Sequence, residues 1–351
     1  MKILALTRYA RLGASSRIRI IQYGDALANH GIDVDVSPLL SDDYLLRQYA
    51  GCRTDWLHVM RCYVRRLGQL ATAGRYDLLW IEKELFPNLP AWFERWLTLT
   101  GKRYVVDYDD AVFPNDLLNP HPLKWLIAGK IDSVMRHASM TVCGNDYIAA
   151  RAAAAGARNI CTLPSVIDLE RYTCVEPPVR QRIVVGWIGS PSTAPYLTLV
   201  LPALRQLAAR YPITLRVVGA QFEATGIDVE CRPWTEAAEV QEISDFDIGI
   251  MPLFDTQWER GKCGYKLIQY MACGRPVVAS PIGINEKIVR AGQTGYLATT
   301  TKQWHDALSA LCSQRGERSA MGARGRLDVE EHYCLQVTVQ QVAGVLREAA
   351  P

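Results

Sequence analysis

The chain has 351 residues, of which 49% are hydrophobic and 21% are charged, and its formal net charge is +3. This length is too great for one ordinary core and suits two domains. The net charge is too small to indicate nucleic-acid binding by itself. No apolar run reaches the roughly 18 residues that a membrane-spanning helix needs, and the first residues become polar too soon for a signal peptide. These features predict a soluble, cytoplasmic protein of two domains.

The ten cysteines are scattered along the chain and form no C-x-x-C pair. Cysteines at regular spacings would be typical of the disulfide framework of a small secreted protein. The scattered pattern instead predicts reduced thiols, most of them buried.

Short apolar runs alternate with helical patterns through the first half of the chain. A helix is expected over 17–30, because its apolar pattern stops at Gly31. The runs expected to form strands are 3–7, 32–36, 78–81, 104–108 and 140–143. Strands that alternate with helices indicate a parallel sheet with helices on both faces.

A charged segment over 170–182, which contains Pro177 and Pro178, interrupts this alternation and is expected to be a linker. The alternation then starts again, with strands expected over 183–188, 215–218, 248–253 and 277–280. The pattern therefore predicts a first domain over 1–175 and a second over 176–335. Each is expected to be an open α/β sheet, which binds ligands at the carboxyl ends of its strands.

The stretch 246–283 carries the clearest chemical pattern of the second half. A buried strand leads into a loop that ends at Gly264, where a helix begins. Such a helix N-terminus offers backbone N–H groups and the positive end of the helix dipole. Lys262 and Lys266 lie one helical turn apart and can face the same anion, and Arg260 can join them. This pattern suits a diphosphate; a plain βαβ crossover with solvated lysines is the alternative.

Three acids, Asp107, Asp109 and Asp110, stand at the carboxyl end of the expected strand 104–108. Their charges repel one another unless the side chains point different ways or meet cations. We interpret Asp109 and Asp110 as functional residues, with helix capping by Asp110 as the alternative.

The segment 53–70 combines apolar residues at helical spacing with arginines. The apolar residues that can line one helix face are Trp56, Leu57, Val59, Met60, Tyr63, Val64, Leu67 and Leu70, and the arginines are Arg53, Arg61, Arg65 and Arg66. A basic amphipathic helix can lie on an anionic membrane surface. Packing of this helix on the protein's own sheet, with solvated arginines, is the alternative.

The sequence MACGRPVVASPIG over 271–283 resembles the donor signature of glycosyltransferase family 4, the large retaining GT-B family of group 1. The resemblance extends over nearly the whole chain and includes the segments 13–17, 142–145 and 163–168 and a last helix near 337–348. It implies an α/β fold of the GT-B type, in which two Rossmann-like, doubly wound domains face each other across a cleft. A C-terminal helix over about 336–351 is then expected to pack back on the first domain.

The resemblance also implies an activity. We expect retaining transfer of a sugar, hexosyl in type, from a nucleotide-sugar donor on the second domain to a glycan or lipid-linked acceptor on the first. This suits cell-surface polysaccharide or glycolipid synthesis at the inner face of the membrane, with neither a metal, a cofactor nor a nucleic acid as partner. The residues expected in the loop on the acceptor side are Gly13, Ser15, Ser16 and Arg17.

The chain departs from the family at a pair of glutamates in the donor region, where the matching positions hold Gly261 and Gln269. Gln269 can still hydrogen-bond ribose hydroxyls, but without the charge of a carboxylate. Glu259, two positions earlier than the expected first glutamate, can take over its role on the transferred sugar if the loop is longer here.

A second departure lies after the first strand of the second domain, where the family tends to place an arginine and a lysine against the diphosphate. The matching positions hold Trp187 and Ser192, which are uncharged. The leaving diphosphate still needs its charge stabilised. We infer that Lys262 and Lys266 do this, with N–H and hydroxyl groups from Gly189 and Ser190; a simple turn over 189–190 is the alternative.

Two further assignments follow from the family match. Asp109 takes the position of a histidine that often faces the sugar, so it is expected to orient the sugar or the acceptor hydroxyl, or to act as a base. Trp234 and Arg232 lie where the family contacts the nucleobase, by stacking and by hydrogen bonds, although Trp234 fits a core position equally well.

Three other functions compete with a transferase. A nucleotide-sugar epimerase or hydrolase of GT-B fold is one, because the glutamate pair is missing. A catalytically inactive nucleotide-sugar-binding protein is another. An NAD-dependent oxidoreductase would also have doubly wound domains, but it is expected to carry G-x-G-x-x-G after a first strand, which neither 7–17 nor 186–192 contains.

Overall fold

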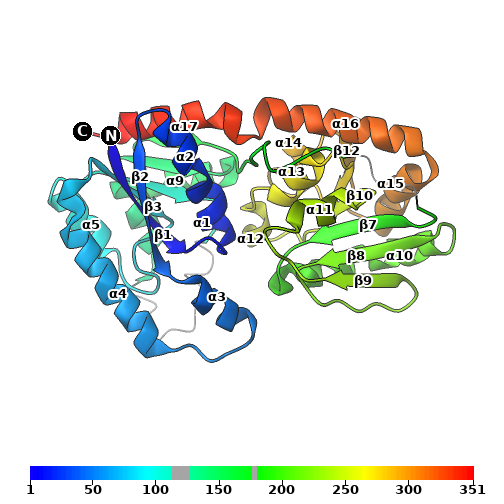
Figure 1. The fold of residues 1–351 in the computed structure, drawn as a ribbon, viewed down its shortest axis with the longest axis horizontal. Helices are drawn as coiled ribbons and strands as arrows, with labels where there is room; N and C mark the ends of the chain where they lie inside the picture. The colour runs from blue at the N-terminus through cyan, green and yellow to red at the C-terminus, as the bar shows by residue number, and fades with distance from the viewer. Residues whose placement is uncertain (113–126, 176–179) are drawn as a thin grey trace. The chain divides into compact units, whose positions relative to one another are not determined.

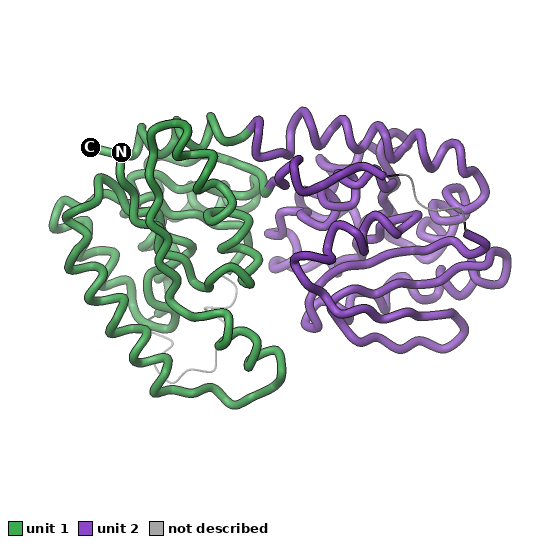
Figure 2. Tube along the Cα trace, viewed as in Figure 1, with its two compact units in different colours: residues 1–165, 338–351 green, residues 166–337 purple. Residues whose placement is uncertain are grey.

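The computed structural model describes residues 1–112, 127–175 and 180–351. It divides into two compact units: unit 1 is Met1–Ser165 with Thr338–Pro351, and unit 2 is Val166–Val337 (Figures 1 and 2). Pro177 and Pro178 of the expected linker lie outside the described residues. No helix among the described residues is both long and apolar enough to cross a membrane.

Unit 1 is built on a parallel sheet of six strands in the order β2-β1-β3-β4-β5-β6. The strands are β1 Lys2–Tyr9, β2 Asp33–Leu40, β3 Leu78–Glu82, β4 Tyr104–Tyr108, β5 Met140–Cys143 and β6 Ile160–Thr162. The helices are α1 Ala14–Arg19, η1 Ile21–Tyr23, α2 Gly24–Ala28, α3 Asp42–Tyr49, α4 Trp56–Ala71, η2 Ala73–Arg75, α5 Trp92–Leu99, α8 Lys130–His137 and α9 Asp146–Ala155. The single helix predicted over 17–30 is wrong: it starts earlier and is divided into α1, η1 and α2. The β-branched pair Ile20–Ile21 and Gly24 are weak helix formers at the breaks.

Unit 2 has a second parallel sheet of six strands, in the order β12-β11-β10-β7-β8-β9. The strands are β7 Ile183–Ile188, β8 Ile213–Val218, β9 Asp228–Arg232, β10 Ile248–Met251, β11 Val277–Ala279 and β12 Gly295–Leu297. The helices are η3 Pro191–Leu199, α10 Leu201–Ala208, α11 Glu239–Ser244, α12 Gln257–Arg260, α13 Tyr265–Ala272, α14 Asn285–Ile288, α15 Thr301–Ser313 and α16 Arg315–His332. Two Rossmann-like units with parallel sheets confirm the predicted fold class.

Aromatic side chains in the core of unit 2 pack directly on glycines of the sheet. A Cβ at Gly186 on β7 would lie 2.0 Å from the Phe246 ring, and one at Gly249 on β10 would lie 2.4 Å from the Tyr270 ring. Close packing of this kind leaves no room for a methyl group. Gly249 therefore sets the distance between β10 and α13, and Gly186 sets the distance between β7 and the segment that precedes β10.

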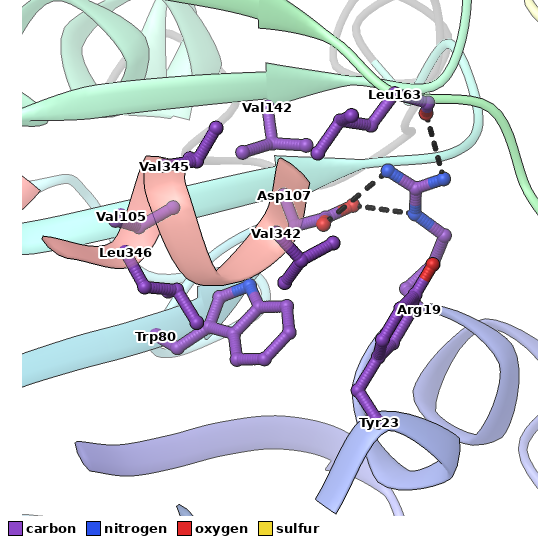
Figure 3. A pocket seen from close by; sticks show the side chains of 10 residues that line it. All are labelled: Arg19, Tyr23, Trp80, Val105, Asp107, Val142, Leu163, Val342, Val345 and Leu346. Atoms are coloured by element: carbon purple, nitrogen blue, oxygen red, sulfur yellow. Dashed lines mark hydrogen bonds and ion pairs between the residues drawn. The ribbon is translucent and has the colours of Figure 1, made fainter. Parts of the chain in front are cut away.

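The chain ends in α17, Leu335–Ala349, most of which belongs to unit 1. Its residues Val342, Val345 and Leu346 face Trp80, Val105 and Val142 of the sheet around a cavity of about 10 Å³, which is near the size of one water molecule (Figure 3). The C-terminal segment is thus part of the core of unit 1.

All ten cysteines are free, and only Cys52 and Cys174 are exposed. The predicted reduced thiols therefore agree with the structure. Burial raises the pKa of the Cys143 and Cys273 thiols to about 12, so these two side chains stay protonated at neutral pH.

Candidate functional site

The loops after β7, β8 and β9 meet at the carboxyl edge of the sheet in unit 2. The backbone N–H of Gly189 donates to Val218, and that of Gly219 donates to Arg232. Gly219 has φ +90°, and a Cβ there would lie 2.4 Å from the carbonyl oxygen of Gly189. Only glycine fits both that backbone conformation and that approach. The loop at Gly189–Ser190 is therefore held against its neighbours.

Lys266 projects from the first turn of α13 toward this loop. Its Nζ lies 4.3 Å from the centroid of the Trp187 ring, and a Cβ at Gly189 would come within 2.6 Å of it. No carboxylate of the described residues pairs with Lys266. Burial and the nearby Lys262 ammonium lower the pKa of Lys266 to about 7. Lys266 is half-buried, and a bound anion stabilises the charged form of such an amine.

The helix start beside Lys266 has the expected form. Gly264 is the N-cap of α13 with φ +64°, and a Cβ there would lie 2.3 Å from Ile288. Lys262 is half-buried, and its Nζ lies 5.2 Å from the centroid of the Trp258 ring. The structure therefore brings Lys262, Lys266 and the Gly189 loop to one edge of unit 2.

The other basic residues predicted for the donor are engaged by acids of their own segments. The Arg260 guanidinium pairs with Asp255, with Nε 2.7 Å from Oδ1 and NH2 3.1 Å from Oδ2. Arg232 pairs with Glu230 two residues away, and its side chain is exposed. Neither cation is held in place for a phosphate or a base in this structure.

Glu259 is buried, and both of its carboxylate oxygens accept hydrogen bonds. The Tyr196 hydroxyl donates to Oε1, and the Thr256 hydroxyl donates to Oε2. Thr256 also caps α12. Glu259 thus has a structural role in the loop before α13, and its role on a sugar stays a prediction.

Gln269 and Trp234 belong to one buried chain of hydrogen bonds. The Gln269 amide donates through Nε2 to the Tyr172 hydroxyl at 2.7 Å, and Tyr172 donates to Glu239 Oε1 at 2.6 Å. The Trp234 indole donates to Glu239 Oε2 at 2.9 Å. Sequence reasoning missed Tyr172 and Glu239, which join the two residues predicted to contact the nucleoside.

In unit 1, the predicted acids at the end of β4 each meet a cation. Arg19 pairs with Asp107, with Nε 2.8 Å from Oδ1 (Figure 3). Lys83, just after β3, lies with Nζ 2.9 Å from Asp109 Oδ1 and 3.6 Å from Asp110 Oδ2. The strands β3 and β4 are neighbours in register, which places Lys83 beside these acids.

Sequence reasoning also missed Lys83, which has an unusual backbone conformation. It has φ +60°, a conformation that costs energy for a residue with a side chain and that clusters at functional sites. Its Nζ also donates to the Ser15 hydroxyl at 3.1 Å. Burial opposes ionisation of Asp109, but the Lys83 ammonium and the hydrogen bond from Ser15 hold its pKa below the usual value.

The predicted acceptor-side loop surrounds this group. Ser16 donates to Glu82 at 2.6 Å, and Arg17 donates to the carbonyl of Arg11 at 2.9 Å. A Cβ at Gly13 would lie 2.5 Å from Tyr9, so the loop turns tightly after β1. The structure brings Ser15 together with Lys83, Asp109 and Asp110, whereas Ser16 and Arg17 hold the loop in place.

Residues 182–314 match the family model described as glycosyl transferases group 1. This part of unit 2 is therefore similar to the domain of group 1 glycosyltransferases. A D-inositol 3-phosphate glycosyltransferase of Pseudarthrobacter chlorophenolicus is 28% identical over 130 residues, which are 36% of this chain and 30% of that relative. The match thus spans less than a third of the relative's length.

Solved structures show the fold over the whole chain. The HepE protein of Anabaena, in complex with UDP, has a TM-score of 0.69 at 17% identity and covers 99% of this chain and 100% of its own. WaaG, a glycosyltransferase involved in lipopolysaccharide biosynthesis, has a TM-score of 0.70 at 14% identity, with 99% of each chain covered. These neighbours are GT-B proteins, and this chain has the GT-B fold.

The ion pairs of Lys83 with Asp109 and Asp110 should contribute to the stability of the protein. Lys83→Met leaves the partly buried Asp109 and Asp110 without this cation, so the unfolding free energy at pH 7 should fall by up to about 3 kcal/mol, the lower end of the range for a fully buried pair. A carboxylate whose pKa is lower in the folded state than in the unfolded state stabilises the folded protein at pH values above its unfolded-state pKa. This contribution is lost as pH falls through the folded-state pKa. In the variant Asp109 takes up a proton at a higher pH than in the wild type, so the difference in unfolding free energy between the two proteins should narrow below about pH 4. Urea unfolding across this pH range measures both effects.

Lys302→Met is the matched control, because Lys302 pairs with Asp306 at 2.5 Å on the exposed surface of α15. Surface ion pairs contribute little, so this variant should unfold like the wild type. Equal, small losses in both variants would show that Lys83 does not compensate the two acids.

Proposed function

We propose that this chain is a retaining glycosyltransferase of family 4. In this proposal, unit 2 binds a UDP-sugar without a metal ion, and a hexosyl group passes to a glycan or lipid-linked acceptor at unit 1. Cell-surface polysaccharide or glycolipid synthesis on the cytoplasmic face of the membrane is the proposed setting. The observation that carries the proposal is Lys266, a half-buried lysine whose amine lies beside a glycine loop and a helix N-terminus.

A diphosphate fits this edge of unit 2 for three physical reasons. The Lys266 amine lacks a carboxylate partner in the described residues and gains charge stabilisation from an anion. The N-terminus of α13 and the N–H groups of the Gly189 loop supply further donors. The Trp187 ring excludes water from one side of the amine, which strengthens its attraction to a phosphate.

The choice of UDP rests on the solved relatives, because the HepE protein is described with UDP, with UDP and glucose, and with UDP-glucose. A thermal-shift comparison of UDP, GDP, ADP and UDP-glucose tests it, since a ligand that binds the folded state raises the melting temperature. Release of UDP from a UDP-sugar that depends on an acceptor would then separate a transferase from an epimerase or hydrolase. No shift with any nucleotide would overturn the proposal.

Lys266→Ala should weaken UDP binding about tenfold or more, because a charge-assisted contact contributes roughly 1.5–3 kcal/mol. The wild type should also bind UDP more weakly as pH rises above about 7. The Lys266 amine of the free protein loses its proton near that pH, whereas a bound diphosphate keeps the amine protonated. Isothermal titration calorimetry at pH 6.5 and 8.5 measures both effects.

Two comparisons make this test specific. Lys302→Ala removes an exposed lysine of the same unit and should keep wild-type affinity at both pH values. Lys266→Ala should lose the fall in affinity between the two pH values. Wild-type affinity in a folded Lys266→Ala variant would remove Lys266 from the site.

For Asp109 we propose that the ionised carboxylate orients a hydroxyl of the sugar or acceptor. Its pKa is held below the usual value by Lys83, which makes it a weak base at neutral pH. Loss of a general base would cost about 10²–10⁴-fold in turnover. Asp109→Asn should therefore lower turnover by less than about 10²-fold. UDP affinity should be unchanged, because in this proposal unit 2 binds the nucleotide.

Release of UDP from the UDP-sugar identified by the thermal shifts, at saturating donor, measures this effect. A loss above about 10²-fold, with an acidic limb of the pH–rate profile that disappears in the variant, would show that Asp109 is the base after all. A loss of UDP affinity would contradict the assignment of the nucleotide to unit 2.

We also propose that α4 places the protein on an anionic membrane. The helix has two apolar faces. One face packs on the rest of unit 1, with Cys62 and Leu70 buried and Val59 and Tyr63 half-buried. The other face is 40–73% exposed and consists of Trp56, Leu57, Met60, Val64 and Leu67. Trp92, Trp96 and Leu99 of α5 are exposed as well. Exposed tryptophans and apolar residues next to basic ones suit the membrane interface.

Of the four arginines in this segment, Arg53 and Arg61 are the exposed ones without a backbone anchor. Arg66 is buried and donates to the carbonyl of Thr7, and Arg65 donates to that of Pro38. The full chain should sediment with anionic vesicles at low salt and less at high salt, because salt screens the arginines. Arg53→Glu with Arg61→Glu should abolish sedimentation, whereas neutral vesicles should bind little. No binding to anionic vesicles at low salt would leave α4 as an ordinary surface helix.

A further inference from the structure

The chain of hydrogen bonds from Gln269 to Trp234 lies within unit 2 and joins four separate segments. Gln269 lies on α13, Tyr172 precedes β7, Glu239 begins α11, and Trp234 follows β9. Gln269, Tyr172 and Glu239 are each at least 97% buried. Most polar groups at this depth are hydrogen-bonded, and each of these three side chains has a hydrogen-bond partner in the chain, which gives its donors and acceptors a definite order.

That order can be derived from the ends. An indole nitrogen only donates, so the Glu239 oxygen opposite Trp234 must accept. The second Glu239 oxygen accepts the single proton of the Tyr172 hydroxyl. Burial raises the pKa of Tyr172, which keeps that proton in place. The Tyr172 oxygen can then only accept, so Gln269 must turn its NH₂ group toward it.

This order leaves the amide oxygen of Gln269 outside the chain of hydrogen bonds. No group among the described residues donates to that oxygen. A carboxylate at the same position would also offer an acceptor. Gln269, although uncharged, is thereby oriented to accept a hydrogen bond as a glutamate would.

We propose that Glu239, acting through Tyr172, is a positioning residue for the nucleoside. It holds Gln269 with Oε1 free to accept from a ribose hydroxyl, and it holds the Trp234 indole beside the base. The inference rests on the proposed function, because it takes the ligand of unit 2 to be a nucleotide.

Glu239→Gln is a sharp test, since it changes one oxygen to an NH₂ group without changing the shape of the side chain. The Trp234 N–H still needs an acceptor, so the new amide must turn its oxygen to Trp234 and its NH₂ to Tyr172. Tyr172 must then donate to Gln269, whose amide flips and presents NH₂ to the ligand. Arg171 lies 3.9 Å from Glu239 but is bound more closely by Glu236, at 3.2 Å. The hydrogen bond from the Trp234 indole therefore decides which way the new amide turns.

Calorimetric titration of the full chain with UDP and with its 2′-deoxy and 3′-deoxy analogues measures the consequence. The wild type should prefer UDP to one analogue by about tenfold, the value of one hydrogen bond. Glu239→Gln should lose that preference through weaker binding of UDP, with binding of that analogue unchanged. Tyr172→Phe, which cuts the chain at another point, should lose the preference too.

The double variant Glu239→Gln with Trp234→Phe distinguishes positioning from a general structural effect. Without the indole N–H, the new amide can again turn its oxygen to Tyr172, so the preference for the ribose should return to that of Trp234→Phe alone. An unchanged preference in folded Glu239→Gln and Tyr172→Phe variants would overturn the inference while UDP binding stands. Failure of the wild type to bind UDP would overturn the proposed function, and this inference with it.

Discussion

The amine of the half-buried Lys266, beside the Trp187 ring and without a carboxylate partner in the described residues, is the feature on which the proposed function of unit 2 depends. Burial of an uncompensated cation is costly, and proteins avoid it unless a ligand supplies the opposite charge. The surrounding backbone favours this arrangement: Gly189 leaves room for the amine, and Gly264 permits the tight start of α13. Under the proposed function, a bound diphosphate supplies the negative charge that this position lacks.

Unit 1 handles charge at the carboxyl edge of its sheet in the opposite way. Its acids are compensated from within, Asp107 by Arg19 and the pair Asp109 and Asp110 by Lys83. Such a site has oriented acceptors for hydroxyl groups. This contrast supports the proposed division, in which the nucleotide belongs to unit 2 and a hydroxyl-bearing sugar or acceptor meets unit 1.

The sequence predicted the elements whose signals are local. Buried strands such as 183–188 and the glycine at the start of α13 were found because periodicity and backbone preference act over a few residues. Lys83 was missed because its role arises from the pairing of β3 with β4 and from a positive φ, neither of which the residue type reveals. Glu239 was missed for the same reason, since it meets Gln269 only through Tyr172.

The two departures from family 4 in the donor region are related through charge. The family's basic pair is replaced by Trp187 and Ser192, and its glutamate pair by Gly261 and Gln269, so two cations and two anions are missing together. Removal of the cations alone would leave the glutamates repelling a diphosphate, while removal of the glutamates alone would leave the cations in excess. In the proposed site, Lys262 and Lys266 supply the positive charge, and Gln269 remains neutral while Tyr172 and Glu239 fix the direction of its amide. The unusual residues of this site are therefore best understood as one coordinated exchange rather than as separate losses.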